Sequence, residues 1–374
     1  MAFDSGNLKA AIDLLLPELD RSSDPRVSLV LGESFRQLGD DANLVRAADR
    51  LLMIDPAQIR PLIWKGDALE RLGDHDGADH YYASALDRAE DANIPPALAV
   101  ELRRVEQFVI DRNKQRSDFL ENYLRRNGID FARQSSRISK SIDILVGRTE
   151  AKMGHQKPTI HYVPDLPERT WYERGDFPWV AALEGQAGAI RDELLGILKD
   201  DSAFVPYVEG NNHGPVRDYQ GLLNNPAWGA FYLWRDGVPE RANIDRCPVT
   251  SAALEAVPQP AIQGRTPTAM FSLLKPGTHI PAHHGMLNAR LICHLPLLVP
   301  NGCAMRVGSE TRSWTEGKLT IFDDTVEHEA WNKSPDTRVV LLFDIARPEL
   351  DEDEMKAVRL CFAAADAYRS AKGD

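Results

Sequence analysis

Residues 269–298 have the sequence AMFSLLKPGTHIPAHHGMLNARLICHLPLL, in which two apolar runs flank a turn. The first run, Ala269–Leu274, ends before the turn pair Pro276-Gly277, and the second run covers Ala289–Leu298. Three more short apolar runs follow at residues 304–307, 319–322 and 338–345. Short strands separated by Gly- and Pro-containing turns are typical of a sandwich or jelly roll. We therefore predict a jelly-roll domain, followed by an amphipathic helix over residues 351–374.

The N-terminal third contains an internal repeat. Residues 31–40 (LGESFRQLGD) and 65–74 (KGDALERLGD) are alike at an offset of 34 residues, the period of a tetratricopeptide (TPR) unit. In each copy a Gly lets two helices approach closely, and a Gly-Asp pair ends the first helix. Such units bury their apolar faces only by stacking, and the helical spacing of residues 96–126 can cap the stack. Two interpretations stay open: a groove for a protein or peptide partner, or a scaffold that orients the C-terminal domain.

Composition excludes several classes of protein. The 374 residues carry 44 basic and 56 acidic side chains, a formal net charge of −12, which disfavours nucleic acid as a partner. The Lys and Arg residues of 103–148 alternate with acids and indicate a solvated helical face. The four scattered cysteines favour a reducing compartment, and no apolar run is long enough to cross a membrane. We predict a cytoplasmic protein.

These patterns predict a multidomain α and β chain. Residues 1–130 would form a TPR-like helical repeat domain and residues 131–164 a helical or irregular linker. Residues 165–350 would form a double-stranded β-helix (jelly-roll, cupin-like) domain with flanking helices. Residues 351–374 would form the C-terminal helix.

Five of the ten histidines fall in the strand-rich region, at His279, His283, His284, His294 and His328. Histidine is the commonest metal ligand, although a lone His in a strand is more often a core residue. Arg338 lies inside the last apolar run, where an internal cation needs a partner. A carboxylate-bearing ligand would supply that partner through a bidentate contact. Two imidazoles plus a strand-borne Arg are the arrangement of a non-haem iron site that uses a 2-oxo acid.

Four stretches, residues 271–280, 283–295, 314–318 and 321–331, resemble the aspartyl/asparaginyl β-hydroxylase family. Weaker similarity starts at residue 177, so the resemblance covers about residues 165–350. It implies an Fe(II)- and 2-oxoglutarate-dependent dioxygenase. Such an enzyme hydroxylates an Asp- or Asn-like side chain in a protein, peptide or amino acid with O2, and releases succinate and CO2. Vertebrate members of the family also carry helical repeats upstream.

The resemblance also implies roles for individual residues. His283 and His328 match the iron ligands. Arg290 matches a position that faces the carboxylate of the substrate. The 2-oxoglutarate site would consist of Ser272, His294 and Arg338, with Trp228 beside the co-substrate.

Two positions depart from common patterns. Gly285 stands where most of the wider dioxygenase superfamily has a carboxylate ligand, but it agrees with this family, which uses two protein ligands and water. Ile292 replaces a common Arg and leaves the substrate open. Three alternatives therefore stay open. The first is halogenation, with chloride in the free coordination position. The second is hydroxylation of a lipid acyl chain, and the third is a TPR adaptor with an inactive barrel.

Neighbouring polar residues are interpreted as structural. His284 should point away from the site because successive side chains of a strand alternate between faces. Asp323 and Asp324 should fix the loop before His328 through Asx-type hydrogen bonds. Glu327 and Glu329 are considered as acceptors that orient His328.

Overall fold

The N-terminal helices are joined by short turns whose chemistry is visible in the sequence. Their bounds are α1 (Leu8–Leu15), a 3-10 turn (Leu16–Glu18), α2 (Pro25–Leu38), α3 (Asp41–Ile54), α4 (Ile59–Leu72) and α5 (His75–Ala89). Gly39 and Gly73 end α2 and α4 with positive φ angles of 72° and 88°. Asp40 and Asp74 then cap α3 and α5 by accepting hydrogen bonds from backbone N–H groups.

Two further glycines set the distance between these helices. A Cβ added at Gly32 would come within 2.5 Å of the Trp64 ring, and one at Gly66 within 2.6 Å of the Tyr82 ring. Real Cβ atoms are not found so close to another heavy atom, so only Gly permits this approach. The two glycines are 34 residues apart in the chain, but their aromatic partners, Trp64 and Tyr82, do not occupy equivalent positions of the repeat.

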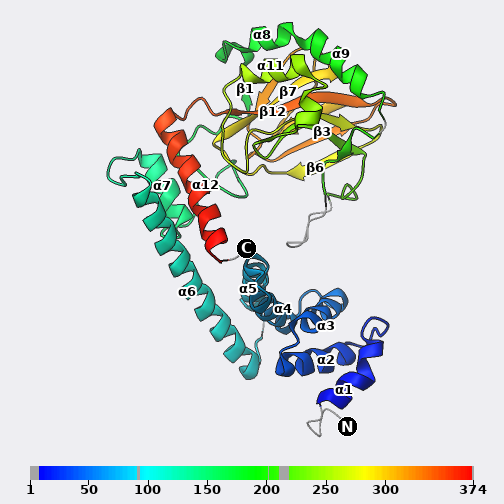
Figure 1. Ribbon diagram of the computed structural model, residues 1–374, viewed down its shortest axis with the longest axis vertical. Helices are drawn as coiled ribbons and strands as arrows, with labels where there is room; N and C mark the ends of the chain where they lie inside the picture. The colour runs from blue at the N-terminus through cyan, green and yellow to red at the C-terminus, as the bar shows by residue number, and fades with distance from the viewer. Residues whose placement is uncertain (1–7, 91–92, 201, 210–218, 373–374) are drawn as a thin grey trace. The chain divides into compact units, whose positions relative to one another are not determined.

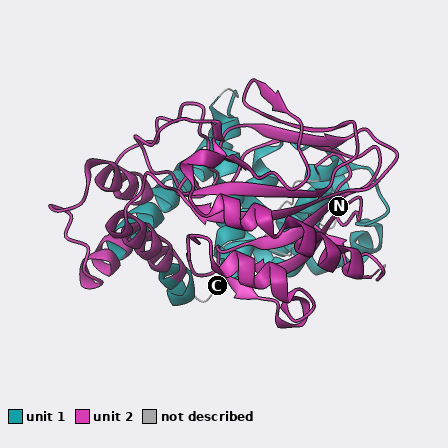
Figure 2. Cartoon of the chain, turned by 90° about the horizontal axis from the view of Figure 1, so that it is seen from above, with its two compact units in different colours: residues 1–119, 211–215, 367–374 teal, residues 120–210, 216–366 magenta. Residues whose placement is uncertain are grey.

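The structure, a computed structural model, describes residues 8–90, 93–200, 202–209 and 219–372. It divides into two compact units (Figure 2), one of residues 1–119, 211–215 and 367–374, the other of residues 120–210 and 216–366. The first unit is helical, whereas the second is rich in antiparallel strands, which is the predicted α and β organisation at its coarsest. The predicted boundaries at residues 130, 164 and 350 stay predictions.

Two antiparallel sheets form the second unit. The larger has the order β1-β10-β7-β12-β5-β3-β2, with β4 paired to β3, and the smaller has the order β6-β11-β8-β9. The larger sheet contains β1 (Trp171–Tyr172), β2 (Val205–Pro206), β3 (Trp228–Arg235), β4 (Val238–Pro239), β5 (Ala269–Leu274), β7 (Arg290–Leu298), β10 (Thr320–Phe322) and β12 (Arg338–Ala346). The smaller contains β6 (His279–His283), β8 (Cys303–Val307), β9 (Glu310–Arg312) and β11 (His328–Asn332).

Helices and the smaller sheet cover opposite faces of the larger sheet. On one face lie α8 (Val180–Gly185), α9 (Ala187–Ile197) and α11 (Pro248–Glu255), and β6 lies on the other side (Figure 1). The helical face buries Leu194 and Leu254 with Phe271 and Leu341 of the sheet. The other face packs Leu274 and Phe322 against side chains of the smaller sheet. The central strands β5, β7 and β12 are therefore buried on both faces, which explains their almost continuous apolar sequences.

The remaining helices are α6 (Pro96–Arg126), α7 (Ser136–Leu145), α10 (Arg241–Ile244), a 3-10 turn (Arg174–Asp176) and α12 (Glu352–Lys372). In the second unit, Glu354 of α12 accepts hydrogen bonds from Ser135 at 2.6 Å and Arg137 at 2.7 Å. Among the described helices, none combines the length and the apolar character that a membrane span requires.

Candidate active site

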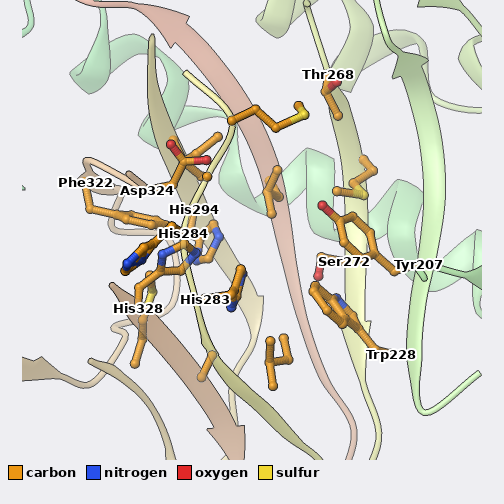
Figure 3. Close-up of a pocket in the computed structure, with 18 of the residues that line it drawn as sticks. Tyr207, Trp228, Thr268, Ser272, His283, His284, His294, Phe322, Asp324 and His328 are labelled. Atoms are coloured by element: carbon orange, nitrogen blue, oxygen red, sulfur yellow. The ribbon is translucent and has the colours of Figure 1, made fainter. Parts of the chain in front are cut away.

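His283 and His328 lie directly opposite each other on neighbouring strands. His283 ends β6 and His328 begins β11, and the two residues are register partners in the antiparallel pair. Opposite residues of such a pair project to the same side of the sheet. Their ring centroids are 4.1 Å apart, and the two rings face a shared space (Figure 3). The structure therefore brings together the two predicted metal ligands, 45 positions apart in the chain.

The same local contact orients both imidazoles. Nδ1 of His283 lies 2.8 Å from the carbonyl oxygen of Pro281, and Nδ1 of His328 lies 3.0 Å from that of Val326. A carbonyl oxygen only accepts hydrogen bonds, so each Nδ1 carries a proton, and in the neutral form of either ring Nε2 then carries the lone pair. Burial lowers the pKa of His328 to about 4, which keeps that ring neutral at pH 7. A neutral imidazole with its Nδ1–H held by a carbonyl is a prepared metal ligand.

A cavity of about 370 Å³ opens beside the two rings. The predicted 2-oxoglutarate residues all line it: Trp228, Ser272, His294 and Arg338. Figure 3 shows Trp228 and Ser272 across the space from the histidines, and His294 among them. Trp228 is also stacked on Tyr207, with ring centroids 4.1 Å apart. These residues come from the inward faces of β3, β5, β7 and β12 in the larger sheet.

Arg338 is the most unusual charge in the cavity wall. Its side chain is 1% exposed, and among the described residues no carboxylate lies within ion-pair distance of it. The guanidinium has a 3.4 Å contact from Nη1 to the Ser272 carbonyl oxygen and lies over the Trp314 ring at 4.6 Å. Its Nε makes no hydrogen bond to a described residue. Burial lowers the pKa of Arg338 to about 10. A buried cation in this state favours an anionic ligand.

Arg290 is buried as well, but its two terminal nitrogens are each paired with a carboxylate, and only its Nε makes no hydrogen bond to a described residue. Its Nη1 donates to Asp344 at 3.0 Å, and its Nη2 donates to Asp324 at 2.9 Å. Burial alone would lower the pKa of Arg290, but the two carboxylates outweigh burial, and the net shift is upward. The predicted role of Arg290, binding the carboxylate of the substrate, stays a prediction, and both carboxylates would compete with that substrate.

Asp324 fills the space beside Gly285. A Cβ added at Gly285 would lie 2.1 Å from Oδ2 of Asp324, so no larger residue fits there without displacing this carboxylate. Asp324 is 6% exposed, lines the cavity, and its Oδ1 makes no hydrogen bond to a described residue. A carboxylate therefore lies near His283 even though the position two residues after that His is Gly.

The prediction that Asp323 and Asp324 both fix the loop before His328 is confirmed for Asp323 and wrong for the Asp324 side chain. Asp323 does fix the loop, because its Oδ1 accepts from the backbone N–H and the hydroxyl of Thr325 at 3.0 and 2.5 Å. Asp324 instead lines the cavity and holds Arg290. Their sequence neighbourhood gives no signal that separates them, because the distinction depends on which way the loop turns each side chain.

Three other structural interpretations can be judged. His284 lines the cavity rather than pointing away, because β6 ends at His283 and the alternation of faces ends there too. Glu329 accepts from Arg306 at 2.5 Å and lies 2.8 Å from His279, and Glu327 accepts from Arg306 at 2.9 Å. The acceptor that orients His328 is therefore the Val326 carbonyl, not either glutamate.

Comparison with known proteins agrees with this geometry. Residues 184–348 match the family model described as aspartyl/asparaginyl beta-hydroxylase. The ornithine lipid ester-linked acyl 2-hydroxylase of Rhizobium tropici is 40% identical over 180 residues, which are 47% of this chain and 60% of that protein. The human aspartyl/asparaginyl beta-hydroxylase is 32% identical over 233 residues, 57% of this chain and 29% of that protein.

A third relative, the human aspartate beta-hydroxylase domain-containing protein 2, is 32% identical over 213 residues, 56% of this chain and 55% of that protein. The chain thus spans 60% or less of the length of each of these three relatives. The matched region contains the two facing histidines, the buried Arg338 and the cavity between the sheets. Residues 184–348 of this chain are thus similar to the aspartyl/asparaginyl β-hydroxylase family, whose model they match.

Proposed function

We propose that this chain is a hydroxylase that uses Fe(II) as its metal and 2-oxoglutarate as its co-substrate. One observation carries the proposal: a buried guanidinium that has no carboxylate partner among the described residues lines the same cavity as two imidazoles whose ring centroids are 4.1 Å apart. The relatives bear hydroxylase names, which supports the reaction type. The two facing antiparallel sheets support a jelly-roll (double-stranded β-helix) fold, and the repeated Gly and Asp turns support TPR-like repeats.

The residues present fit the proposed metal. His283 and His328 would bind Fe(II) through Nε2, the nitrogen left with a lone pair. Across the described ranges, no group of three or more His, Cys, Asp or Glu side chains is placed to hold a metal ion. The protein would thus provide two ligands, and water or the co-substrate would provide the others. Imidazole and carboxylate ligands suit a non-haem iron.

The residues also fit a keto-diacid. Arg338 Nε, Trp228 Nε1 and His294 Nδ1 are buried polar atoms that make no hydrogen bond to a described residue. Arg338 would hold the distal carboxylate of 2-oxoglutarate by a charge-assisted contact, with the Ser272 hydroxyl beside it. The cavity of about 370 Å³ falls within the range of roughly 300–1,000 Å³ that is usual for small-molecule sites.

In this assignment the protein binds, orients and excludes water. Pro281 and Val326 carbonyls hold the ligand rings, Arg338 sets the direction of the co-substrate, and Phe322, Ile280 and Met305 form dry walls. The bound iron, with 2-oxoglutarate and O2, would supply the oxidising chemistry that hydroxylates an unactivated carbon and releases succinate and CO2. Hydroxylation is favoured over halogenation because the Asp324 carboxylate, rather than open space for chloride, lies beside Gly285.

The names of the relatives suggest two substrate classes, an Asp- or Asn-like side chain and an ester-linked acyl chain. A protein partner at the helical repeats and a cytoplasmic location stay predictions.

Succinate release tests the proposal. The purified chain with Fe(II), 2-oxoglutarate and O2 should release succinate, measured by mass spectrometry against an anaerobic blank. The His328→Ala variant should lose at least 99% of that release, whereas His155→Ala, at an exposed position, should keep it. Equal release by His328→Ala and the parent would disprove the metal assignment.

A further inference from the structure

The cavity continues from the histidines along a row of apolar side chains. His294, Leu342, Met270 and Tyr232 are successive register partners across β7, β12, β5 and β3. All four line the cavity, and Tyr232 and Met270 pack with Leu342 in one hydrophobic cluster. Residues in register on adjacent strands share a face of the sheet. The row therefore leads from the proposed reaction centre into apolar surroundings.

A fourth apolar side chain borders this row. Ile292 lies on β7 two residues before His294 and on the same face, and it is 5% exposed. It separates His294 from Arg290 along the strand. We call the part of the cavity lined by Tyr232, Met270, Ile292 and Leu342 the apolar wing.

The charges around the apolar wing are already neutralised. Arg290 is held by Asp324 and Asp344, and Arg235 donates to Glu209 at 2.5 Å. Of the guanidinium groups that line the described cavity, Arg338 alone has no carboxylate partner, and the proposed function gives that group to 2-oxoglutarate. Among the lining residues that the structure describes, no guanidinium is then left to pair with a carboxylate on a second substrate. An unpaired anion in such a buried place would be costly, and Asp324 would repel it.

We propose that the apolar wing binds an uncharged, saturated acyl chain of the substrate, and that Ile292, Met270 and Leu342 determine this specificity. This inference rests on the proposed function, because it assigns Arg338 to the co-substrate. The target carbon would then lie in an alkyl chain rather than next to a free carboxylate.

Three probes separate the substrate classes and the source of the acyl chain. Octanoyl amide provides a soluble acyl chain, phosphatidylcholine in detergent micelles provides a lipid, and a capped Gly-Asp-Gly peptide provides a carboxylate. With the full chain, Fe(II), 2-oxoglutarate and O2, we expect at least one acyl probe to raise succinate release at least tenfold and to gain 16 Da. The peptide should do neither. Hydroxylation of the peptide alone, or no stimulation by either acyl probe, would overturn the inference.

The length of the chain gives a second test without any substitution. With butanoyl, hexanoyl and octanoyl amides, kcat/KM should rise about fourfold for each CH2 buried, the factor that corresponds to about 0.8 kcal/mol. Equal kcat/KM for the three amides would contradict an apolar wing.

Substitutions then locate the specificity. Ile292→Arg should lower the acyl-stimulated rate at least tenfold, whereas Ile292→Leu and the exposed control Leu195→Arg should stay within about twofold of the parent. Equal acyl-stimulated rates for Ile292→Arg and the parent would contradict the role of Ile292. Calorimetric binding of 2-oxoglutarate to the Mn²⁺-loaded parent separates two kinds of failure. Intact binding without acyl turnover refutes only this inference, whereas absence of binding refutes the proposed function and this inference together.

Discussion

Arg338 is the first residue of β12 and Arg347 directly follows its last residue, and both side chains are 1% exposed. Arg347 has a complete set of partners, with Asp323 at 2.6 Å, the Pro167 carbonyl at 2.6 Å and the Tyr172 hydroxyl at 2.8 Å. Within the described part of the chain, Arg338 has one long contact to a carbonyl oxygen and no carboxylate partner. The difference separates a structural cation from one prepared for a ligand. The two arginines are equally buried and differ only in their hydrogen-bond and ion-pair partners.

The largest effect is expected for the partnered arginine. Arg347→Met leaves Asp323 buried without its cation, and breaking a buried pair in this way costs about 3–5 kcal/mol. Urea unfolding should show this loss, while Arg133→Met, whose parent side chain is 85% exposed, should change the free energy of unfolding little. If Arg347→Met were as stable as the parent, the structural half of the comparison would fail.

Arg338→Met should change the free energy of unfolding in the opposite direction. Removing a buried cation that has no carboxylate partner relieves a desolvation cost, so the free energy of unfolding without ligands should rise by about 1–3 kcal/mol. The measurement is the same urea titration, in a chelating buffer and without 2-oxoglutarate. A loss of several kcal/mol would mean that Arg338 already has partners in the folded chain.

The buried imidazole of His161 should make the stability of the folded chain depend on pH. His161 is 5% exposed, lies 3.1 Å from the Ser141 hydroxyl, and burial lowers its pKa to about 4. The unfolded chain binds a proton near pH 6.5 and the folded chain does not, so stability is present above pH 6.5 and is lost as pH falls toward 4. Between pH 7 and pH 5 this group should cost about 2 kcal/mol.

The test for His161 is the difference in unfolding free energy between those two pH values. His161→Gln does not titrate and should lose about 2 kcal/mol less than the parent, whereas exposed His155→Gln should behave like the parent. An identical pH dependence for His161→Gln and the parent would show that folding does not lower the pKa of His161.

The strands and the paired histidines could be predicted from the sequence, for identifiable reasons. Central strands buried on both faces give continuous apolar runs, so β5 has the predicted bounds and β7 begins one residue later than predicted. The residues around His283 and His328 form long, ordered motifs. Their direct opposition across β6 and β11, however, depends on the strand register, which no local pattern specifies.

The contrast between the two arginines could not be predicted. Pro167 and Asp323 contact Arg347 from distant parts of the chain. The sequence around Arg338 gives no sign that, among the described residues, no carboxylate lies beside its side chain. The role of Asp324 could not be predicted either, because Asp324 is adjacent to Asp323 in sequence but its side chain faces Arg290 and Gly285. Side-chain direction in a loop depends on contacts that are remote in sequence.

Calorimetric titration of 2-oxoglutarate tests the central claim most directly, with the parent chain and Arg338→Met, each with and without Mn²⁺ in place of iron. The account predicts tight binding only for the metal-loaded parent, weakened about ten- to a hundredfold in Arg338→Met, the loss expected for one charge-assisted contact. Equal affinity of the parent and Arg338→Met, or binding that does not depend on the metal, would contradict it.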